Sequence, residues 1–277
     1  MAGLKGKNTQ MFALTHPPAG DIHLAGRVYS LVRIFKHDFW AATCLYRDVE
    51  DRCPPDRIVV KYFRTQPFWG MPLDWLGRLM CDREQAIYAA LRDLEGVPRW
   101  LGRVGEAAFA IEYVDAMPLD HQQDLPDGFF GRLRGLFDAV HSRGVGYADA
   151  NKRSNILVSR SGGPVLVDFQ ISIRRRDDWP CPARQLSAAL VRYIAHKDIY
   201  HLYKHNRRMC PHLMSEEQLK LSRNRGGLHR LHRKLGKPYR FIRRAFLATL
   251  HRRGRLVSPT AYLEDHHQPE KATWRGD

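Results

Sequence analysis

Three polar side chains have the types and the spacing to act together on a phosphate group. Asp149 lies in a polar stretch, Asn155 opens the apolar run after it, and Asp168 ends the next apolar run. The link between the two runs, residues 159–163, reads Ser-Arg-Ser-Gly-Gly and predicts a hairpin that brings these residues to one end. In phosphoryl transfer one carboxylate orients the acceptor hydroxyl, while an amide oxygen and a second carboxylate hold Mg²⁺. The pattern therefore indicates metal-dependent phosphoryl transfer.

The sequence around these residues resembles a known family. The stretch 140–169 is similar to the catalytic core of protein-kinase-like enzymes, in which the catalytic loop reads H-R-D-x-x-x-x-N and the metal-binding aspartate lies in D-F-G. The resemblance extends over residues 28–205. It is most marked toward small bacterial kinase-like proteins with D-x-x-K-R-x-N-I-L-V followed by V-D-F, and the lipopolysaccharide-core kinases are a related branch.

The resemblance implies a role for each matched residue. Asp149 would orient the acceptor hydroxyl, and Asn155 and Asp168 would bind Mg²⁺. Because the loop from Asp149 to Asn155 is one residue longer than in the family motif, Lys152 or Arg153 would reach the γ-phosphate of ATP from the altered loop. The acceptor would be a hydroxyl of a protein Ser/Thr or of a lipopolysaccharide-core sugar, and the residues do not decide between them.

The residues before this core fit the same family in the same order. Val59-Val60-Lys61 matches the V-A-I-K strand, whose lysine contacts the nucleotide phosphates. Glu84 follows 23 residues later on an expected helix, where it would pair with Lys61. Residues 111–114 match the hinge, where backbone groups of Glu112 and Val114 would bond adenine.

Several positions depart from the family pattern. Residues 36–40, at the hairpin that would cover the phosphates, contain no glycine, so Lys36 or His37 would supply charge instead. Tyr147 begins the pair that replaces His-Arg, which disfavours control by a phosphorylated activation segment. The catalytic-loop spacing is one residue longer than in the motif, and Gln170 replaces the glycine of D-F-G. These departures keep a non-catalytic pseudokinase open as an alternative.

The elements that must position these residues follow from apolar periodicity. Strands are expected over 29–35, 41–46, 57–63, 100–104 and 107–114, and helices over 74–95, 128–142 and much of the chain beyond 182. This order predicts an α+β, bilobal protein-kinase-like fold, with a small β-rich lobe carrying one main helix and a mostly helical second lobe. The expected domains are an irregular tail at 1–26, lobes at 27–116 and 117–215, and a basic helical extension at 216–277.

The chain is strongly basic, with 45 Lys and Arg against 29 Asp and Glu among 277 residues. Residues 1–173 carry 21 basic and 20 acidic residues, a net of +1, whereas residues 174–277 carry 24 and 9, a net of +15. The charge predicts an acidic acceptor or docking surface, such as anionic lipid at the inner face of a membrane. The lack of a signal or a membrane-length apolar run, with five scattered cysteines, favours the cytoplasm.

Three features of the C-terminal part allow more than one interpretation. Asp198 is either the helical aspartate that bonds the catalytic-loop backbone in the family or an exposed helix acid. His201 and His205 have the spacing of a metal pair, but without an H-E-x-x-H pattern they predict a solvated helix face. An apolar stripe among arginines at 239–250 predicts a helix that docks on the helical lobe or lies on a membrane. A protein that binds anionic lipid or nucleic acid on a kinase-like scaffold is the third function considered, and no recognised module supports nucleic acid.

Overall fold

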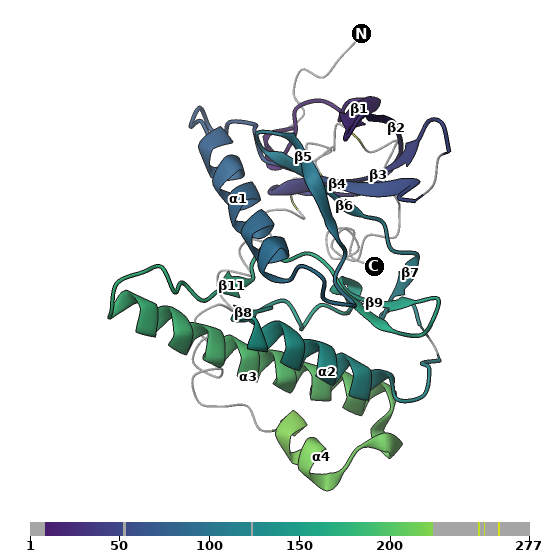
Figure 1. Ribbon diagram of the computed structural model, residues 1–277, viewed down its shortest axis with the longest axis vertical. Coiled ribbons are helices and arrows are strands. Elements are labelled where there is room, and N and C mark those ends of the chain that lie inside the picture. The colour runs from purple at the N-terminus through teal and green to yellow at the C-terminus, as the bar shows by residue number, and fades with distance from the viewer. Residues whose placement is uncertain are drawn as a thin grey trace. The chain divides into compact units, whose positions relative to one another are not determined.

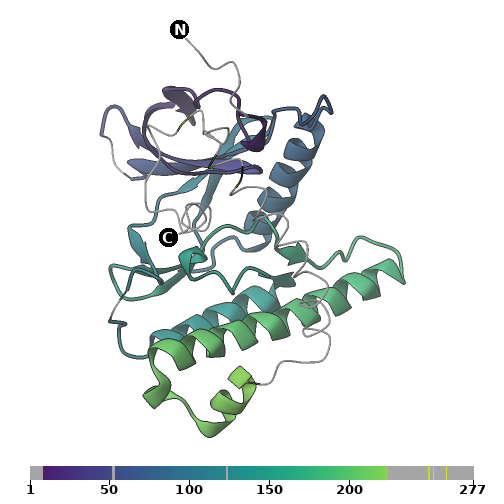
Figure 2. The same cartoon turned by 180° about the vertical axis from the view of Figure 1, so that it is seen from behind.

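The computed structural model describes residues 9–51, 54–122 and 124–223, together with Thr249, Arg252 and Thr260. Within these residues the chain has an α+β fold (Figures 1 and 2). The strands are β1 (Asp21–Leu24), β2 (Arg27–His37), β3 (Ala41–Asp48), β4 (Arg57–Phe63), β5 (Trp100–Gly105), β6 (Ala108–Glu112), β7 (Ala116–Pro118), β8 (Val145–Gly146), β9 (Ile156–Ser159), β10 (Pro164–Leu166) and β11 (Ile173–Arg174). The helices are α1 (Asp74–Ala90), α2 (Phe129–Ser142), α3 (Ala183–Met209) and α4 (Glu216–Arg223), with short 3-10 turns at Thr9–Met11, Arg153–Asn155 and Pro211–Leu213.

The largest sheet has six strands in the order β1-β2-β3-β4-β6-β5. The β2–β3 hairpin and the strands over 57–63, 100–104 and 107–114 are confirmed. β4 pairs antiparallel with β3 on one side and with β6 on the other. This central place sets Lys61 opposite Thr43 and Phe109, in the interior of the sheet.

One buried cluster holds this sheet together. Its largest members include Ile34 on β2, Tyr46 on β3, and Ile58 and Val60 on β4, all fully buried. Alternate residues of a strand point to the same face, which is why β4 contributes residues two apart. Burial of each large apolar side chain contributes roughly 1.5–3 kcal/mol.

The prediction of an irregular segment over 1–26 is wrong for Asp21–Leu24, which form β1. β1 pairs antiparallel with β2, with Asp21 opposite Ser30. Ile22 joins the buried cluster and is 5% exposed. A strand of four residues with one buried side chain is too short to show a recognisable alternation in the sequence, so only its pairing with β2 identifies it as a strand.

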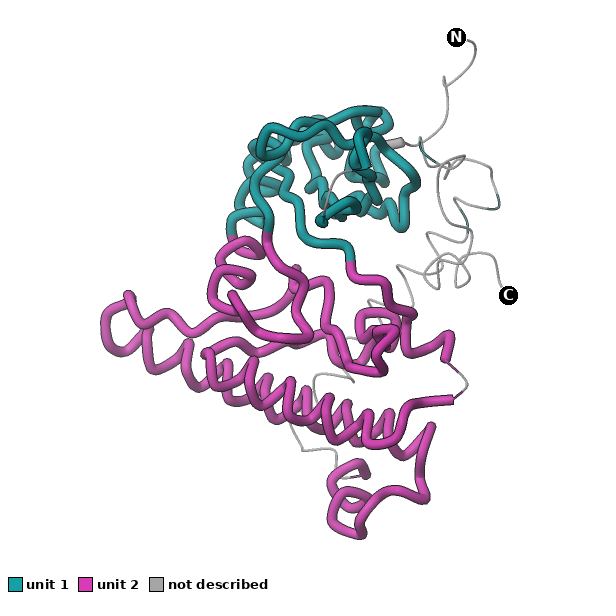
Figure 3. The backbone as a smooth tube through the Cα atoms, turned by 45° about the vertical axis from the view of Figure 1, so that its right-hand side comes forward, with its two compact units in different colours: residues 1–82, 101–113, 226–277 teal, residues 83–100, 114–225 magenta. Residues whose placement is uncertain are grey.

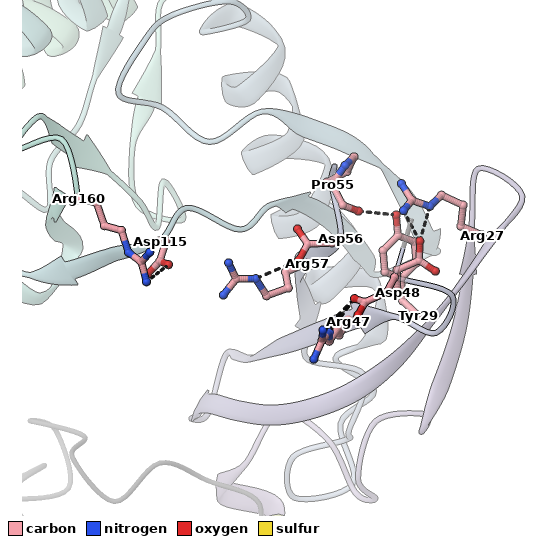
Figure 4. A network of polar contacts seen from close by, with 10 residues as sticks. Arg27, Tyr29, Arg47, Asp48, Pro55, Asp56, Arg57, Asp115 and Arg160 are labelled. Carbon is pink, nitrogen blue, oxygen red and sulfur yellow. Dashed lines mark hydrogen bonds and ion pairs between the residues drawn. The ribbon is translucent and has the colours of Figure 1, made fainter. Parts of the chain in front are cut away.

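Polar contacts join the start of β2 to the end of β3 (Figure 4). Asp48, at the end of β3, is buried and accepts hydrogen bonds from the guanidinium of Arg27 at the start of β2. The hydroxyl of Tyr29 donates to the carbonyl of Pro55, 3.1 Å away, in the link between β3 and β4. These contacts fix the register of the strands that lead to Lys61.

Within the described residues after 114 the chain forms three helices, α2, α3 and α4, and two small sheets. β9 pairs with β10 and with β7, and β8 pairs with β11. α2 buries Leu133, Phe137 and Val140, spaced three and four residues apart, and packs along α3. Gly144 has φ +73°, the left-handed conformation that ends a helix at little cost, so the chain can turn directly into β8.

α3 is long, and its buried residues follow one face. Ser187, Val191, Ile194, Asp198 and Leu202 are buried at spacings of three and four residues. The buried face of α3 therefore continues without a break past Asp198. α4 packs against this helix, and the guanidinium of Arg207 donates to the carbonyl of Ser222 at 3.2 Å.

The chain divides into two compact units (Figure 3). Of the described residues, the first unit holds 9–51, 54–82 and 101–113 together with Thr249, Arg252 and Thr260, and the second holds 83–100, 114–122 and 124–223. The division falls inside α1, after Asp82. The lobes at 27–116 and 117–215 stay a prediction.

No helix in the described ranges is long and apolar enough to cross a membrane. Within the expected extension at 216–277, α4 occupies Glu216–Arg223. The apolar stripe at 239–250 lies outside the described residues apart from Thr249.

Candidate active site

The loop between β8 and β9 brings three of the predicted residues together. Asp149 is 8% exposed, and its Oδ2 accepts a hydrogen bond from Nδ2 of Asn155 at 2.8 Å. Nζ of Lys152 forms an ion pair with the same oxygen at 3.0 Å. The loop is closed by backbone bonds from Lys152 N to Asp149 O and from Asn155 N to Lys152 O. Two donors on one carboxylate oxygen fix how the Asp149 side chain is turned.

Asp168 reaches the same end of the β9–β10 hairpin. The N–H of Val167 donates to the carbonyl of Asn155 at 3.1 Å, which extends the pairing up to Asp168. Asp168 has φ +61°, and Ala148, on the other side of the loop, has φ +68°. Residues other than glycine are strained in this left-handed region, and such strain gathers at functional sites. The hairpin prediction is thus confirmed, and two strained residues accompany the candidate site.

Asp198 of α3 is fully buried and holds the start of this loop. Its Oδ2 accepts a hydrogen bond from Tyr147 N at 2.9 Å, and its Oδ1 accepts one from Ala148 N at 3.0 Å. Nε2 of His141 lies 3.1 Å from Oδ2. Burial raises the pKa of Asp198, although His141 and the two N–H groups oppose that rise. Of the two interpretations, the buried aspartate that bonds the loop backbone is confirmed.

Tyr147 has a role that its place in the motif did not reveal. It is fully buried, and its hydroxyl lies 3.0 Å from the carbonyl oxygen of Asn155 and 2.5 Å from that of Val167. Its own carbonyl accepts a hydrogen bond from Oγ of Ser172 at 2.7 Å. Burial, and then the nearby carboxylates, raise the pKa of Tyr147 far above its usual value. The phenol therefore stays protonated and donates to the backbone beside both predicted metal ligands.

Glu84 is buried on α1 and contacts the residue after Asp168. Its Oε1 accepts a hydrogen bond from the N–H of Phe169 at 3.1 Å. The ring of Phe169 meets those of Tyr88 and Tyr147 edge to face, each at 5.2 Å between centroids. Burial, and then the charges of Glu84 and Asp168, raise the pKa of Tyr88. The backbone that carries Asp168 is thus fixed from α1 as well as from the loop.

The remaining predicted nucleotide contacts are divided between the two units. Lys61, on β4, and Glu112, at the end of β6, belong to the first unit. Glu84 and Val114 belong to the second. Lys61 is 6% exposed, and its Nζ lies 5.5 Å from the centre of the Phe63 ring. The Lys61–Glu84 pair and the adenine contacts of Glu112 and Val114 remain predictions.

The hairpin tip between β2 and β3 is a tight turn closed by Asp38. Its Oδ1 accepts hydrogen bonds from the N–H groups of Trp40, at 2.7 Å, and Ala41, at 2.9 Å. Nζ of Lys36 lies 2.8 Å from Oδ2 of Asp38. Burial acts to raise the pKa of Asp38, but Lys36 and the turn N–H groups bring the pKa below its usual value. The charge of Lys36 is therefore shared with a carboxylate of the same turn.

The suggestion that His37 supplies charge at this tip is wrong. The ring is 1% exposed, its Nε2 accepts a hydrogen bond from Leu14 N at 3.1 Å, and its Nδ1 lies 2.7 Å from Oγ1 of Thr260. Because Nε2 acts as an acceptor, the ring is neutral and carries its proton on Nδ1. A register irregularity between Ile34 and Lys36 turns His37 to the buried side of β2.

The prediction of a solvated face for His201 and His205 is also wrong, since both are buried. Nε2 of His205 donates to the carbonyl of Ala150 at 2.9 Å. Its Nδ1 has no hydrogen-bond partner within the described ranges. Burial lowers the pKa of His205 to about 4, so the ring is neutral near neutral pH. His205 thus supports the residue after Asp149.

Asn155 and Asp168 are the expected ligands of Mg²⁺. No group of three or more His, Cys, Asp or Glu side chains that could hold a metal occurs among the described residues. Mg²⁺ in phosphotransferases, however, is held by one or two protein ligands and by phosphate oxygens. Asp168 offers a carboxylate, and Nδ2 of Asn155 is used on Asp149, so its amide oxygen is the atom suited to a cation. The two residues therefore fit the ion.

Comparison with protein-family models and with curated proteins finds no match. Among solved structures, the Rio2 kinase from Chaetomium thermophilum is similar with a TM-score of 0.50 and 18% identity, over 74% of this chain and 62% of that one. The Rio2 kinase-ADP/Mg²⁺-phosphoaspartate complex from the same organism gives a TM-score of 0.47 and 18% identity, over 74% and 61%. The chain thus matches less than two thirds of either structure. At this identity the likeness concerns the fold, and the chain has a protein-kinase-like α+β fold.

Proposed function

We propose that this protein is an ATP-dependent phosphotransferase that moves the γ-phosphoryl group to a hydroxyl. The observation that carries the proposal is the hydrogen bond between Asp149 and Asn155 at the end of the hairpin that also bears Asp168. Asp and Asn are common at hairpin ends as turn formers, where they are exposed. Here Asp149 and Asn155 are both buried, and their side chains bind each other. This arrangement supports chemistry rather than turn formation.

Each residue of the loop has a distinct task in this proposal. Asp149, held by Asn155 and Lys152, orients the acceptor hydroxyl and receives its proton. Lys152 has a side chain that is 42% exposed, so it can swing from Asp149 to the transferred phosphoryl group. Asn155 and Asp168 would hold Mg²⁺, which offsets negative charge on the phosphates when it is bound.

The nucleotide contacts complete the proposal. Lys61 would bind the phosphates and pair with Glu84, as in the family that the sequence resembles. Backbone groups of Glu112 and Val114 would bond adenine. Lys36 would add positive charge near the phosphates, although the ion pair with Asp38 reduces that contribution. These assignments place nucleotide binding in residues 27–116 and phosphoryl transfer in 117–215.

The acceptor is proposed to be acidic, because residues 174–277 carry a net charge of +15. A protein Ser/Thr and a lipopolysaccharide-core sugar are the two candidate hydroxyls. An enzyme of this kind would act in the cytoplasm, with the basic extension at 216–277 able to contact an anionic membrane. Labelled ATP incubated with a fractionated lysate distinguishes the acceptors by whether label enters protein or lipopolysaccharide.

Nucleotide binding is tested by thermal unfolding with Mg²⁺ and ADP or ATP. A ligand at about 100 times its Kd stabilises the folded state by about 2.7 kcal/mol. We expect this Mg²⁺-dependent stabilisation in the wild type and its loss in Asp168→Asn. The matched control is Asp138→Asn, which removes an exposed carboxylate of α2 paired with Arg134.

The outcomes separate the proposal from its rivals. No stabilisation by either nucleotide in the presence of Mg²⁺ overturns the nucleotide assignment. Stabilisation without transfer to any acceptor identifies a pseudokinase. Salt-dependent binding to RNA or acidic vesicles that survives Lys61→Ala and Asp149→Ala, with no nucleotide effect, identifies a binding protein on a kinase-like scaffold.

A further inference from the structure

Three basic side chains lie close to the loop that carries Asp149. Arg153 belongs to the 3-10 turn at the end of this loop, whereas Lys204 and Arg208 belong to α3. They share His205 as a neighbour: burial lowers the pKa of this ring most, and the positive charges of all three residues lower it further. Nε2 of His205 in turn donates to the carbonyl of the residue after Asp149. We call Arg153, Lys204 and Arg208 the cationic cluster.

The two members on α3 lie on the side of the helix that contacts the loop. Nζ of Lys204 donates to Oδ1 of Asn151 at 2.7 Å. Arg208 follows Lys204 by one helical turn, and residues four apart lie on one side of a helix with their Cβ atoms about 5–6 Å apart. Asn151 follows Asp149 by two residues, so their Cα atoms are at most about 7 Å apart. The cluster therefore lies beside the carboxylate that is proposed to orient the acceptor hydroxyl.

The positive charge of the two arginines is not offset by a carboxylate of the described chain. Within the described ranges, the side chains of Arg153 and Arg208 form no hydrogen bond and no ion pair. Arg208 is exposed and Arg153 is partly exposed, so both can contact a bound molecule. Other arginines of the same unit pair with an aspartate close to them in the sequence, namely Arg134 with Asp138, Arg175 with Asp177 and Arg176 with Asp178.

The chemistry of the cluster suits a phosphate group better than a carboxylate. Like charges held close together repel one another, and a bound anion removes that repulsion. A phosphate monoester carries a charge of about −1.5 to −2 at neutral pH and offers three strong acceptor oxygens. The planar guanidinium of arginine donates two parallel hydrogen bonds to such a group. A carboxylate would offset a single positive charge out of the cluster.

We propose that the cationic cluster binds a phosphate group that the acceptor already carries, next to the hydroxyl that is to be phosphorylated. The proposal rests on the proposed function, in which Asp149 orients that hydroxyl and Lys152 contacts the transferred phosphoryl group. The acceptor class is then a hydroxyl compound that bears a phosphate monoester. A phosphorylated sugar and a phosphorylated peptide both present this chemistry.

Calorimetric titration in the absence of nucleotide tests the proposal and distinguishes the two sources. One pair of probes is a hexose monophosphate and the free hexose, and the other is a serine peptide with a neighbouring phosphoserine and the same peptide with serine. We expect the wild type to bind the phosphorylated member of one pair more tightly than its partner. Arg208→Gln should raise the Kd for that probe about tenfold to a hundredfold, the effect of losing hydrogen bonds to a charged group.

The matched control is Arg192→Gln. Arg192 is an exposed arginine of the same helix, about 24 Å from Arg208 along the helix axis at about 1.5 Å per residue. Glutamine is a good helix former, so both variants keep α3. The control should leave the Kd of the phosphorylated probe unchanged. In transfer from labelled ATP, Arg208→Gln should raise the KM of the phosphorylated acceptor by the same factor as its Kd and leave the KM for ATP unchanged.

The binding measurement can fail without touching the proposed function, because it contains no nucleotide. Equal binding of the phosphorylated and unphosphorylated probes, or no binding of either at millimolar concentrations, overturns the proposal. An equal Kd in Arg208→Gln and the wild type overturns it too, since the phosphate is then bound elsewhere. Binding that ADP with Mg²⁺ abolishes also overturns it, because the cluster would then hold the nucleotide and not the acceptor.

Discussion

Replacement of Tyr147 by phenylalanine isolates a single hydroxyl at the centre of the candidate site. The ring remains to pack against Phe169, and only the oxygen that contacts the carbonyls of Asn155 and Val167 is lost. The backbone bonds of Tyr147 to Asp198 and Ser172 do not involve the side chain. Any effect therefore reports on the two carbonyl contacts.

The size of the effect follows from what each carbonyl retains. The oxygen of Asn155 keeps a hydrogen bond from the N–H of Val167, so it stays satisfied. The oxygen of Val167 loses the donor that Tyr147 supplies. The Tyr147–Val167 contact is half-buried, so the unpaired carbonyl costs the lower part of the about 1–3 kcal/mol of a fully buried one. We expect a loss of about 1 kcal/mol in the free energy of unfolding, or a fall in Tm of about 2–4 °C for a chain of this size.

Urea unfolding of Tyr147→Phe and the wild type measures this loss, with Tyr203→Phe as the matched control. The hydroxyl of Tyr203 accepts a hydrogen bond from Arg134 at 3.0 Å, but that guanidinium is also bonded to Asp138. The control should cost about 0.5 kcal/mol or less. If both variants lose equal stability, or if Tyr147→Phe loses none, the reasoning fails. Under the proposed function, Tyr147→Phe also lowers kcat more than it changes the KM for ATP, because the loosened backbone is that of Val167, next to Asp168.

Two further predictions concern a buried histidine and a close helix contact. The pKa of His205 is about 4 in the folded chain and about 6.5 in the unfolded chain. As the pH falls from about 6.5 to 4, the unfolded state therefore binds a proton at His205 that the native state does not bind. In urea titrations the free energy of unfolding of the wild type should fall by about 2 kcal/mol from pH 7 to pH 5, and that of His205→Gln should fall by less. An identical fall in the two proteins would contradict the assignment of this pH dependence to His205. A Cβ on Gly77 would lie 1.9 Å from the carbonyl oxygen of Arg64, whereas one on Gly135 meets nothing within 4 Å. Calorimetry should therefore find Gly77→Ala destabilised by at least about 2 kcal/mol and Gly135→Ala neutral or stabilised by up to about 1 kcal/mol, and effects of the same size and sign would refute the steric argument.

Local chemistry explains which parts of the site could be predicted. A Ser-Arg-Ser-Gly-Gly link between two apolar runs leaves few structures other than a hairpin, so the nearness of Asn155 to Asp168 followed from turn rules. The side-chain bond from Asn155 to Asp149 then needs only the short loop between them. The β-branched residues next to Lys61 were sufficient to predict that Lys61 lies on a strand.

The burial and contacts of side chains that depend on how distant elements pack could not be predicted from the sequence. Asp198, His201 and His205 share one face of α3 at spacings of three and four residues, so they are buried or exposed together. The sequence pattern leaves Asp198 open between two interpretations and predicts exposed histidines, because no local pattern shows which face of a helix packs against its neighbour. The prediction for His37 was wrong because the register irregularity between Ile34 and Lys36, the second of two in β2, changes which side chains point inward. The hydroxyl of Tyr147 finds its acceptors only after the β9–β10 hairpin has formed.

The turn closed by Asp38 has a consequence for any anion that approaches this hairpin. The N–H groups of Trp40 and Ala41 already point at one carboxylate oxygen, which is how successive backbone donors cradle a phosphate oxygen in a glycine-rich loop. The chain thus carries its own resident anion at this position. An incoming phosphate must either displace Asp38 or rely on side chains, and exchange at the turn becomes a competition between a tethered ligand and a free one.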